Sequence, residues 1–268
     1  MSNSSQTIIA RLARRNAAQA LLFGASFVIA LILWQIGYMA LNLPSFILPS
    51  PAEVWLKFLS VLRSGVLWRN LSQTLLEVLL GLVFGSFTAA LLGYVLSKSP
   101  ALERLFSPLL VASQSVPMVA IAPLLVIWFG PGLFSKVLIC ALVVFFPVLV
   151  NTLVALREVS PNLRELMASL GATPAQTLRT LELPASLPVF MGGLRVGATL
   201  SVIGAIVGEL VGSDRGLGFL INVGRGQYDS ALVFVAVITL ILLASLLYGS
   251  ILLLEKRVLA WQTWRQAP

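Results

Sequence analysis

Three ionisable residues, Glu77, Arg195 and Glu209, lie within or near the ends of long apolar stretches. A charged side chain is costly in lipid, so such residues usually face the interior of a helix bundle or a water-filled path. For Glu77, which is near the end of its stretch, a side chain that reaches the membrane surface is a sufficient explanation. Arg195 and Glu209 are fourteen positions apart, about 21 Å along one helix, so they cannot pair within one chain. Both are candidates for lining a polar path.

The residue types needed for most enzyme chemistry are missing. The chain has no histidine and one cysteine, Cys140, which excludes histidine-activated nucleophiles, histidine metal sites and an intrachain disulfide. Its ten acidic residues are scattered, without the clusters that intramembrane transferases and phosphatases need. No G-x-x-x-x-G-K-[ST] phosphate loop is present. We therefore predict a non-catalytic chain without a metal site or a cofactor of its own.

The composition is that of a membrane protein. Hydrophobic residues make up 58% of the 268 positions and charged residues 10%, whereas soluble domains carry about 25% charged residues. The net charge of +8 is spread over several connections, which argues against a nucleic-acid-binding face. Six apolar stretches can each cross a hydrocarbon layer about 30 Å thick as a helix. They lie at about 21–41, 75–96, 107–129, 134–156, 188–212 and 231–254.

The basic residues predict the orientation. The first apolar stretch is too long for a signal-peptide core of about 7–15 residues, so we interpret it as an uncleaved helix. Lysine and arginine are more frequent in the connections on the side of the N-terminus, which places both termini in the cytoplasm. We expect cytoplasmic segments at 1–20 and 259–268, a six-helix membrane domain at 21–258, and a cytoplasmic loop at 160–184.

Small residues recur every four positions in the second and fifth stretches. Such rows let helix backbones approach closely. A packed bundle explains them, and the alternative is a dimer interface or a moving gate. The glycines concerned are Gly81, Gly85, Gly93, Gly193, Gly197, Gly204 and Gly208.

The third stretch is rich in proline. Pro108 suits a helix start, whereas Pro117 and Pro123 each remove a backbone hydrogen bond and should kink or break the helix. Broken helices occur at membrane depth where they face protein or a cavity, although a simple packing kink is equally compatible. The candidate path or gate residues are Pro117, Pro123, Asn151, Arg195 and Glu209.

The segment 160–184, SPNLRELMASLGATPAQTLRTLELP, predicts two short helices. Ser160 with Pro161 can begin the first helix and Gly171 can end it. Thr173 and Gln176 form a capping-box pattern for the second, which we expect Pro184 to stop. The first helix carries an apolar face but is too short to be stable alone. That face therefore needs the bilayer, the protein's own bundle or a partner to cover it.

This segment resembles the EAA loop of ABC-importer permeases, whose pattern is E-A-A-x3-G-x9-I-x-L-P. A glutamate, a bulkier pair in place of the two alanines, a glycine, a leucine in place of the isoleucine and a final L-P stand at those spacings. The residues of the loop to which the resemblance assigns ATPase coupling are Glu165, Leu166, Met167, Leu170, Gly171, Leu181, Leu183 and Pro184.

Other stretches resemble the nitrate, sulfonate and taurine branch of these permeases, which also handles thiamine precursors and riboflavin-type solutes. They are ILPSPAEVW, VPMVAIAPLLVIWFGPG, FFPVLVNT and GELVGSDRGLGFLI, so the resemblance covers about 21–258. It implies a type I ABC-importer permease bundle of six transmembrane helices, with a coupling helix that sits in a groove of a cytoplasmic ATPase.

The resemblance also implies partners and a mechanism. An ATPase dimer would bind ATP and Mg and rock two permease copies, as a homodimer, between inward-open and outward-open states in the bacterial inner membrane. An extracytoplasmic binding protein would dock on 42–74 and 213–230 and deliver a small polar solute: a sulfonate, nitrate, or a thiamine- or riboflavin-type heterocycle. The alternative is a self-sufficient channel or secondary transporter, which would need no capped docking helix.

Overall fold

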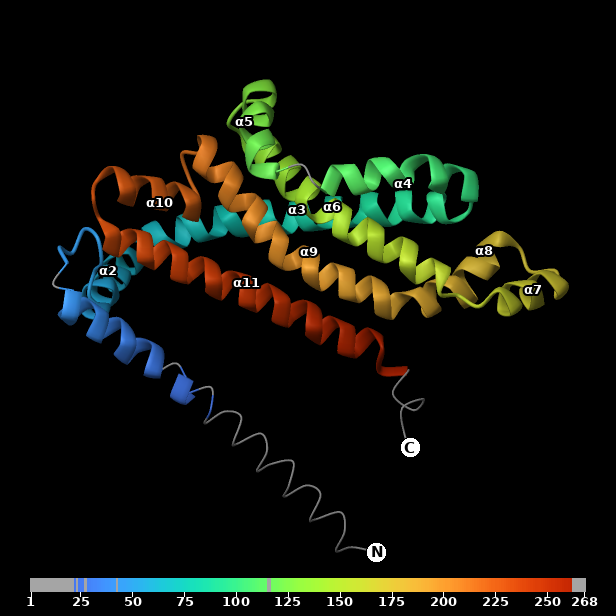
Figure 1. The fold of residues 1–268 in the computed structure, drawn as a ribbon, viewed down its shortest axis with the longest axis horizontal. Helices are drawn as coiled ribbons and strands as arrows, with labels where there is room; N and C mark the ends of the chain where they lie inside the picture. Colours follow the sequence, from blue (N-terminus) through green and yellow to red (C-terminus); the bar gives the residue numbers. More distant parts are fainter. Residues whose placement is uncertain (1–21, 23, 27, 42, 115–116, 262–268) are drawn as a thin grey trace, which may run out of the picture.

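The computed structural model describes residues 22–261 except 23, 27, 42, 115 and 116, and these residues form helices joined by turns. The expected segment 1–20 and most of the expected tail 259–268 lie outside the described residues. Figure 1 shows an elongated bundle in which the long helices run side by side. Five of the described helices are long and apolar enough to cross a membrane. They are Gly24–Leu41, α3 (Val66–Ser97), α6 (Leu133–Arg157), a continuous helix Pro174–Gly212 that includes α9 (Leu183–Gly212), and α11 (Ser230–Val258).

The centre of the bundle is α6, which lies between α3 and α9 and makes the most extensive helix contacts. Glycines make this close approach possible. A side-chain carbon at Gly85 of α3 would lie 2.6 Å from the carbonyl oxygen of Ala141, and one at Gly204 of α9 would lie 2.9 Å from Cα of Cys140. The rows of small residues are therefore placed against α6 within the same chain. The other glycines of the two rows that face α6 are Gly81, Gly93, Gly193, Gly197 and Gly208.

Short helices mark the two ends of the bundle (Figure 1). At one end are α2 (Pro51–Arg63) and α10 (Leu217–Gly226), and we call it the α10 end. At the other, the α7 end, are α7 (Pro161–Ser169) and α8 (Pro174–Thr177). α11 packs along α9 and contacts both α2 and α10, so the α10 end is tied together more extensively than the α7 end.

The predicted span at 107–129 is divided into two helices, α4 (Pro100–Gln114) and α5 (Met118–Phe129). Pro117 has an extended backbone and directly precedes α5, whereas Pro123 lies inside α5. Packing of Ala122 and Leu125 in a small apolar core holds α5 together across Pro123. The number of spanning helices is therefore close to the six predicted, with the third in two pieces.

The prediction that Pro108 begins a helix is wrong, because Pro108 lies inside α4. The same start signal occurs earlier in the chain, where Ser99 precedes Pro100. The backbone N–H of Leu102 donates to Ser99 Oγ at 3.4 Å, as in an N-cap. This earlier serine and proline begin the helix, and Pro108 is carried within it.

The first spanning helix, Gly24–Leu41, lies mostly apart from the rest of the described chain, with none of its residues buried. Trp34 forms its main link to the bundle. The indole stacks on Phe234 of α11 with ring centres 5.2 Å apart and donates a hydrogen bond to the carbonyl of Pro49 at 3.1 Å. The remainder of this helix presents apolar side chains outward.

Candidate functional sites at the two ends of the bundle

The turn after α7 forms as its local sequence predicts. Ser160 precedes α7, with Pro161 at the first position as predicted, but the Ser160 side chain accepts no hydrogen bond from the first turn, so the predicted N-cap is not formed. At the other end of α7, Gly171 has φ +70°, a conformation that glycine adopts without steric cost. Its N–H donates to the carbonyl of Ala168, and the N–H of Ala172 donates to that of Met167, both at 3.0 Å. This pair of bonds is the Schellman arrangement that terminates helices, so the chain direction after α7 is fixed by its own backbone.

The second helix of the loop also begins as predicted. Thr173 N–H donates to Gln176 Oε1 at 2.7 Å, and Gln176 N–H donates to Thr173 Oγ1 at 3.3 Å, which is a capping box. However, the prediction that Pro184 stops this helix is wrong. One continuous helix runs over Pro174–Gly212, through a π-helical turn η1 (Leu178–Glu182). In this wider turn the N–H of Leu183 bonds to the carbonyl of Leu178, and the altered register accommodates a proline that has no N–H.

The apolar face of α7 is not covered by the described chain. Leu163, Leu166 and Leu170 are 47%, 52% and 72% exposed. Glu165 and Gly171 are also exposed, and Met167 is half-buried. Further along, Leu183 is exposed, whereas Leu181 and Pro184 are half-buried. Leucines gathered on one side of a helix and left open to solvent are typical of a surface that a partner covers.

A buried acidic residue, Glu182, ties this loop to the bundle. Its side chain is 1% exposed, and Lys98 Nζ donates to both carboxylate oxygens at 2.7 and 2.8 Å. Arg164 Nε of α7 lies 3.3 Å from Glu182 Oε1. We call Lys98, Arg164 and Glu182 the Glu182 cluster. Sequence reasoning missed Glu182, although a lone acid between leucines at the start of a membrane span could have indicated it.

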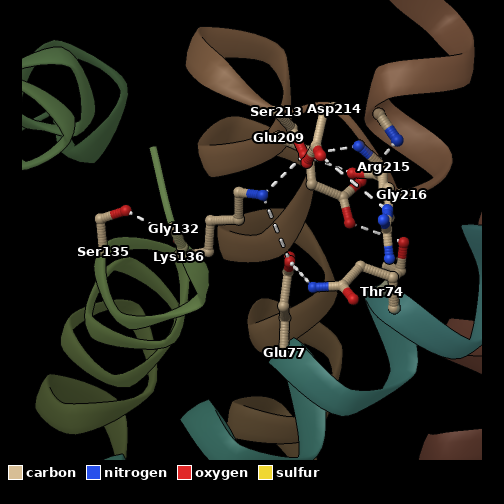
Figure 2. Close-up of polar contacts among 12 residues, drawn as sticks. Thr74, Glu77, Gly132, Ser135, Lys136, Glu209, Ser213, Asp214, Arg215 and Gly216 are labelled. Carbon is tan, nitrogen blue, oxygen red and sulfur yellow. Dashed lines mark hydrogen bonds and ion pairs between the residues drawn. The ribbon is translucent and has the colours of Figure 1, made fainter. Parts of the chain in front are cut away.

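The α10 end contains a second buried charge cluster, shown in Figure 2. Glu77 of α3 and Glu209 of α9 are fully buried, and Lys136 of α6 is 2% exposed. Lys136 Nζ lies 3.6 Å from Glu77 Oε1 and donates to Ser213 Oγ at 2.6 Å. The interpretation that Glu77 reaches the membrane surface is therefore wrong. The opposite charge of Lys136 compensates the burial of its carboxylate.

Glu209 is enclosed by hydrogen-bond donors from two elements. Thr74 Oγ1 of α3 donates to one of its oxygens at 2.6 Å, and the backbone N–H of Gly218 donates to the other at 2.5 Å. Gly216, with φ +114°, passes so close that a side chain there would overlap the Glu209 carboxylate. Its N–H donates to Asn70 Oδ1 at 2.8 Å. The turn before α10 is thus folded directly over Glu209.

The structure does not bring the predicted path residues together. Arg195 Nε lies 3.1 Å from Glu255 Oε2 of α11. Asn151 donates to the carbonyl of Pro147 at 2.8 Å within α6 and lies against Gly193. Glu209 belongs to the cluster at the α10 end, whereas Pro117 precedes α5 and Pro123 lies within it. Their role in a path or gate stays a prediction.

The bundle of apolar spanning helices, with an exposed short helix at one end, fits a membrane permease. The chain belongs to the family of binding-protein-dependent transport system inner membrane components, whose sequence profile matches residues 81–260. It is a multi-pass membrane protein and the permease subunit of an ABC importer, and a separate ATPase hydrolyses ATP. The predictions of an all-helical ABC-importer permease and of a non-catalytic subunit are confirmed. The family match does not support the alternative of a self-sufficient channel or secondary transporter.

Individual relatives narrow the comparison. The chain is 44% identical over 237 residues to the riboflavin transport system permease protein RibX of Chloroflexus aurantiacus, with 88% of each chain covered. It is 35% identical over 236 residues to the formylaminopyrimidine transport permease protein ThiX of Halalkalibacterium halodurans, covering 88% of this chain and 94% of that one. The fold is similar to the inward-facing MetNI methionine ABC transporter, with TM-score 0.58, 23% identity, and coverage of 74% of this chain and 96% of that one.

Proposed function

We propose that the loop 160–184 docks on the ATPase subunit of the importer, with α7 as the coupling helix. The observation that carries this proposal is the exposed leucine face of α7, on a helix that has Pro161 at its first position and a C-terminal turn fixed by its own backbone at Gly171. A short helix of this kind gains little stability alone, so a partner groove is its natural receiver. The residues proposed to contact the ATPase or to hold the loop for it are Glu165, Leu166, Met167, Leu170, Gly171, Leu181, Leu183 and Pro184.

The remaining assignments are proposed together with the docking. The α7 end would face the cytoplasm of a bacterial cell, with both chain termini on that side of the inner membrane. ATP and Mg would be bound by the ATPase dimer alone. Two copies of this permease would form the path as a homodimer, which works by alternating access. The binding protein would dock at the α10 end, on 42–74 and 213–230.

We further propose a flat, uncharged heterocycle of the riboflavin type as the solute. Both relatives described above are named for nitrogen heterocycles, and the riboflavin permease has the higher identity of the two. The charge distribution supports this choice over sulfonate or nitrate. Arg195, the candidate anion contact, is already engaged by Glu255, and Lys136 is buried beside Glu77.

Docking is tested by placing a charge on the leucine face. Leu170→Glu puts a carboxylate on the residue directly after α7, the most exposed leucine of this face, while Ala168→Glu puts the same charge on an exposed residue outside that face. We expect Leu170→Glu to abolish copurification of the ATPase, and Ala168→Glu to retain it, with both variants inserted in the membrane. Normal copurification of the Leu170→Glu variant would show that α7 is not the docking helix. Uptake of riboflavin, taurine and nitrate by the reconstituted importer then tests the solute.

A further inference from the structure

The Glu182 cluster joins four elements at one point. Lys98 is the residue that ends α3, and Arg164 is on α7. Glu182 is the last residue of η1, immediately before α9. The guanidinium of Arg164 also donates to the carbonyl of Leu156 near the end of α6, at 2.6 Å. A displacement of α7 therefore acts on the ends of all three helices of the bundle centre.

Arg164 is the polar side-chain link between α7 and the other helices of the described chain. Leu163 and Leu166 of α7 are exposed and Met167 is only half-buried, so packing contributes little to holding this helix in place. The Glu182 carboxylate is buried, whereas the side chains of Lys98 and Arg164 are 43% and 37% exposed. Because both cations reach solvent, removing the charge of Glu182 does not leave a buried, unpaired cation.

We propose that Glu182 is a positioning residue that transmits the movement of α7 to α3 and α9. The inference rests on the docking proposed above, because the movement would begin with the ATPase on α7. Glu182 is well placed for this role, since it lies in a π-helical turn, a feature that is frequent at functional sites. The Glu182 carboxylate interacts with Lys98 at the end of α3 and with Arg164 of α7, and such charge-assisted contacts can couple the positions of the two helices.

Hydrogen exchange of the permease–ATPase complex in lipid nanodiscs tests this transmission without knowledge of the solute. Exchange is compared with and without ATP and Mg, under conditions that block hydrolysis. In the wild type we expect nucleotide to change exchange in α7, at the end of α3 and at the start of α9. In Glu182→Gln, which keeps the side-chain size, the change should be confined to α7, with the effect on α3 and α9 reduced about tenfold, within the usual range of coupling between sites.

Matched variants separate transmission from simple support. Glu158→Gln makes the same change at an exposed carboxylate after α6 and should behave as the wild type. Lys98→Met should reproduce the loss in α3, the double variant with Glu182→Gln should add nothing further, and Lys98→Arg should restore the wild-type pattern. The inference is overturned if nucleotide changes hydrogen exchange in α3 and α9 of Glu182→Gln as much as in the wild type. It is also overturned if the wild type shows no change beyond α7, or if Glu182→Gln loses the ATPase altogether.

The docking proposal has its own readout in the same experiment. Addition of the ATPase without nucleotide should slow exchange in α7 if the helix is docked. Absence of that protection removes the docking proposal, whereas normal protection with unchanged transmission in Glu182→Gln removes only the role of Glu182.

Discussion

Lys136 provides the sharpest test of the buried charges at the α10 end. Lys136→Met keeps the length and apolar stem of the side chain and removes its charge. Because Lys136 is 2% exposed and Glu77 is fully buried, the substitution leaves the Glu77 carboxylate, 3.6 Å from the lost ammonium, without its cation. Removing one partner of a buried pair typically costs about 3–5 kcal/mol. With a shift of about 2–4 °C for each kcal/mol in a chain of this size, we expect the melting temperature in detergent to fall by about 10 °C.

Two further variants control this measurement. Lys57→Met makes the same change in a partly exposed ion pair with Asp229 and should cost less than about 1 kcal/mol. Adding Glu77→Gln to Lys136→Met removes the uncompensated charge, so the double variant should recover much of the lost stability. The reasoning is refuted if Lys136→Met has the melting temperature of the wild type, or if adding Glu77→Gln lowers the melting temperature of Lys136→Met further.

Three other predictions concern a close helix contact, a glycine with positive φ and a buried hydrogen bond. Gly85→Val should lower the yield of folded protein and cost at least about 1–3 kcal/mol by overpacking against α6, whereas Gly24→Ala, with open space around it, should melt as the wild type does. Gly171→Val forces a β-branched residue to φ +70°, a strain of about 1–3 kcal/mol, and should weaken ATPase copurification while membrane insertion, measured by fractionation, is retained. Thr74→Val removes both a donor to Glu209 and an acceptor for the N–H of Leu217, and should cost about 1–3 kcal/mol in thermal melting; an unchanged melting temperature would contradict the hydrogen-bond assignment.

The features that could be predicted from sequence are those that depend on local chemistry. The turn at Gly171 and the capping box of Thr173 and Gln176 formed as expected, because each needs only residues a few positions apart. The apolar stretches predicted spanning helices because a membrane requires such lengths. Pro184 departed from its local signal because a π-helical turn adjusts the register before it. Helix limits thus depend on context that a local pattern does not contain.

The charge pairs could not be predicted, because each joins residues far apart in the chain. Lys98 and Glu182 meet only when the ends of α3 and η1 lie together, and Glu77 meets Lys136 only through the packing of α3 on α6. The sequence does indicate that buried acids need partners, but it does not say which helix supplies them. The sequence alone therefore predicts a place at the membrane surface for Glu77 and gives Glu182 no partner.

The glycine contacts on both sides of α6 limit the ways in which this permease can change shape. If α3 or α9 slid along α6 by one residue, about 1.5 Å, a neighbouring side chain would replace Gly85 or Gly204 at the contact. There is no room for a side-chain carbon at either position. We therefore expect α3, α6 and α9 to move together in a change of conformation, as in rigid-body transitions between packed states.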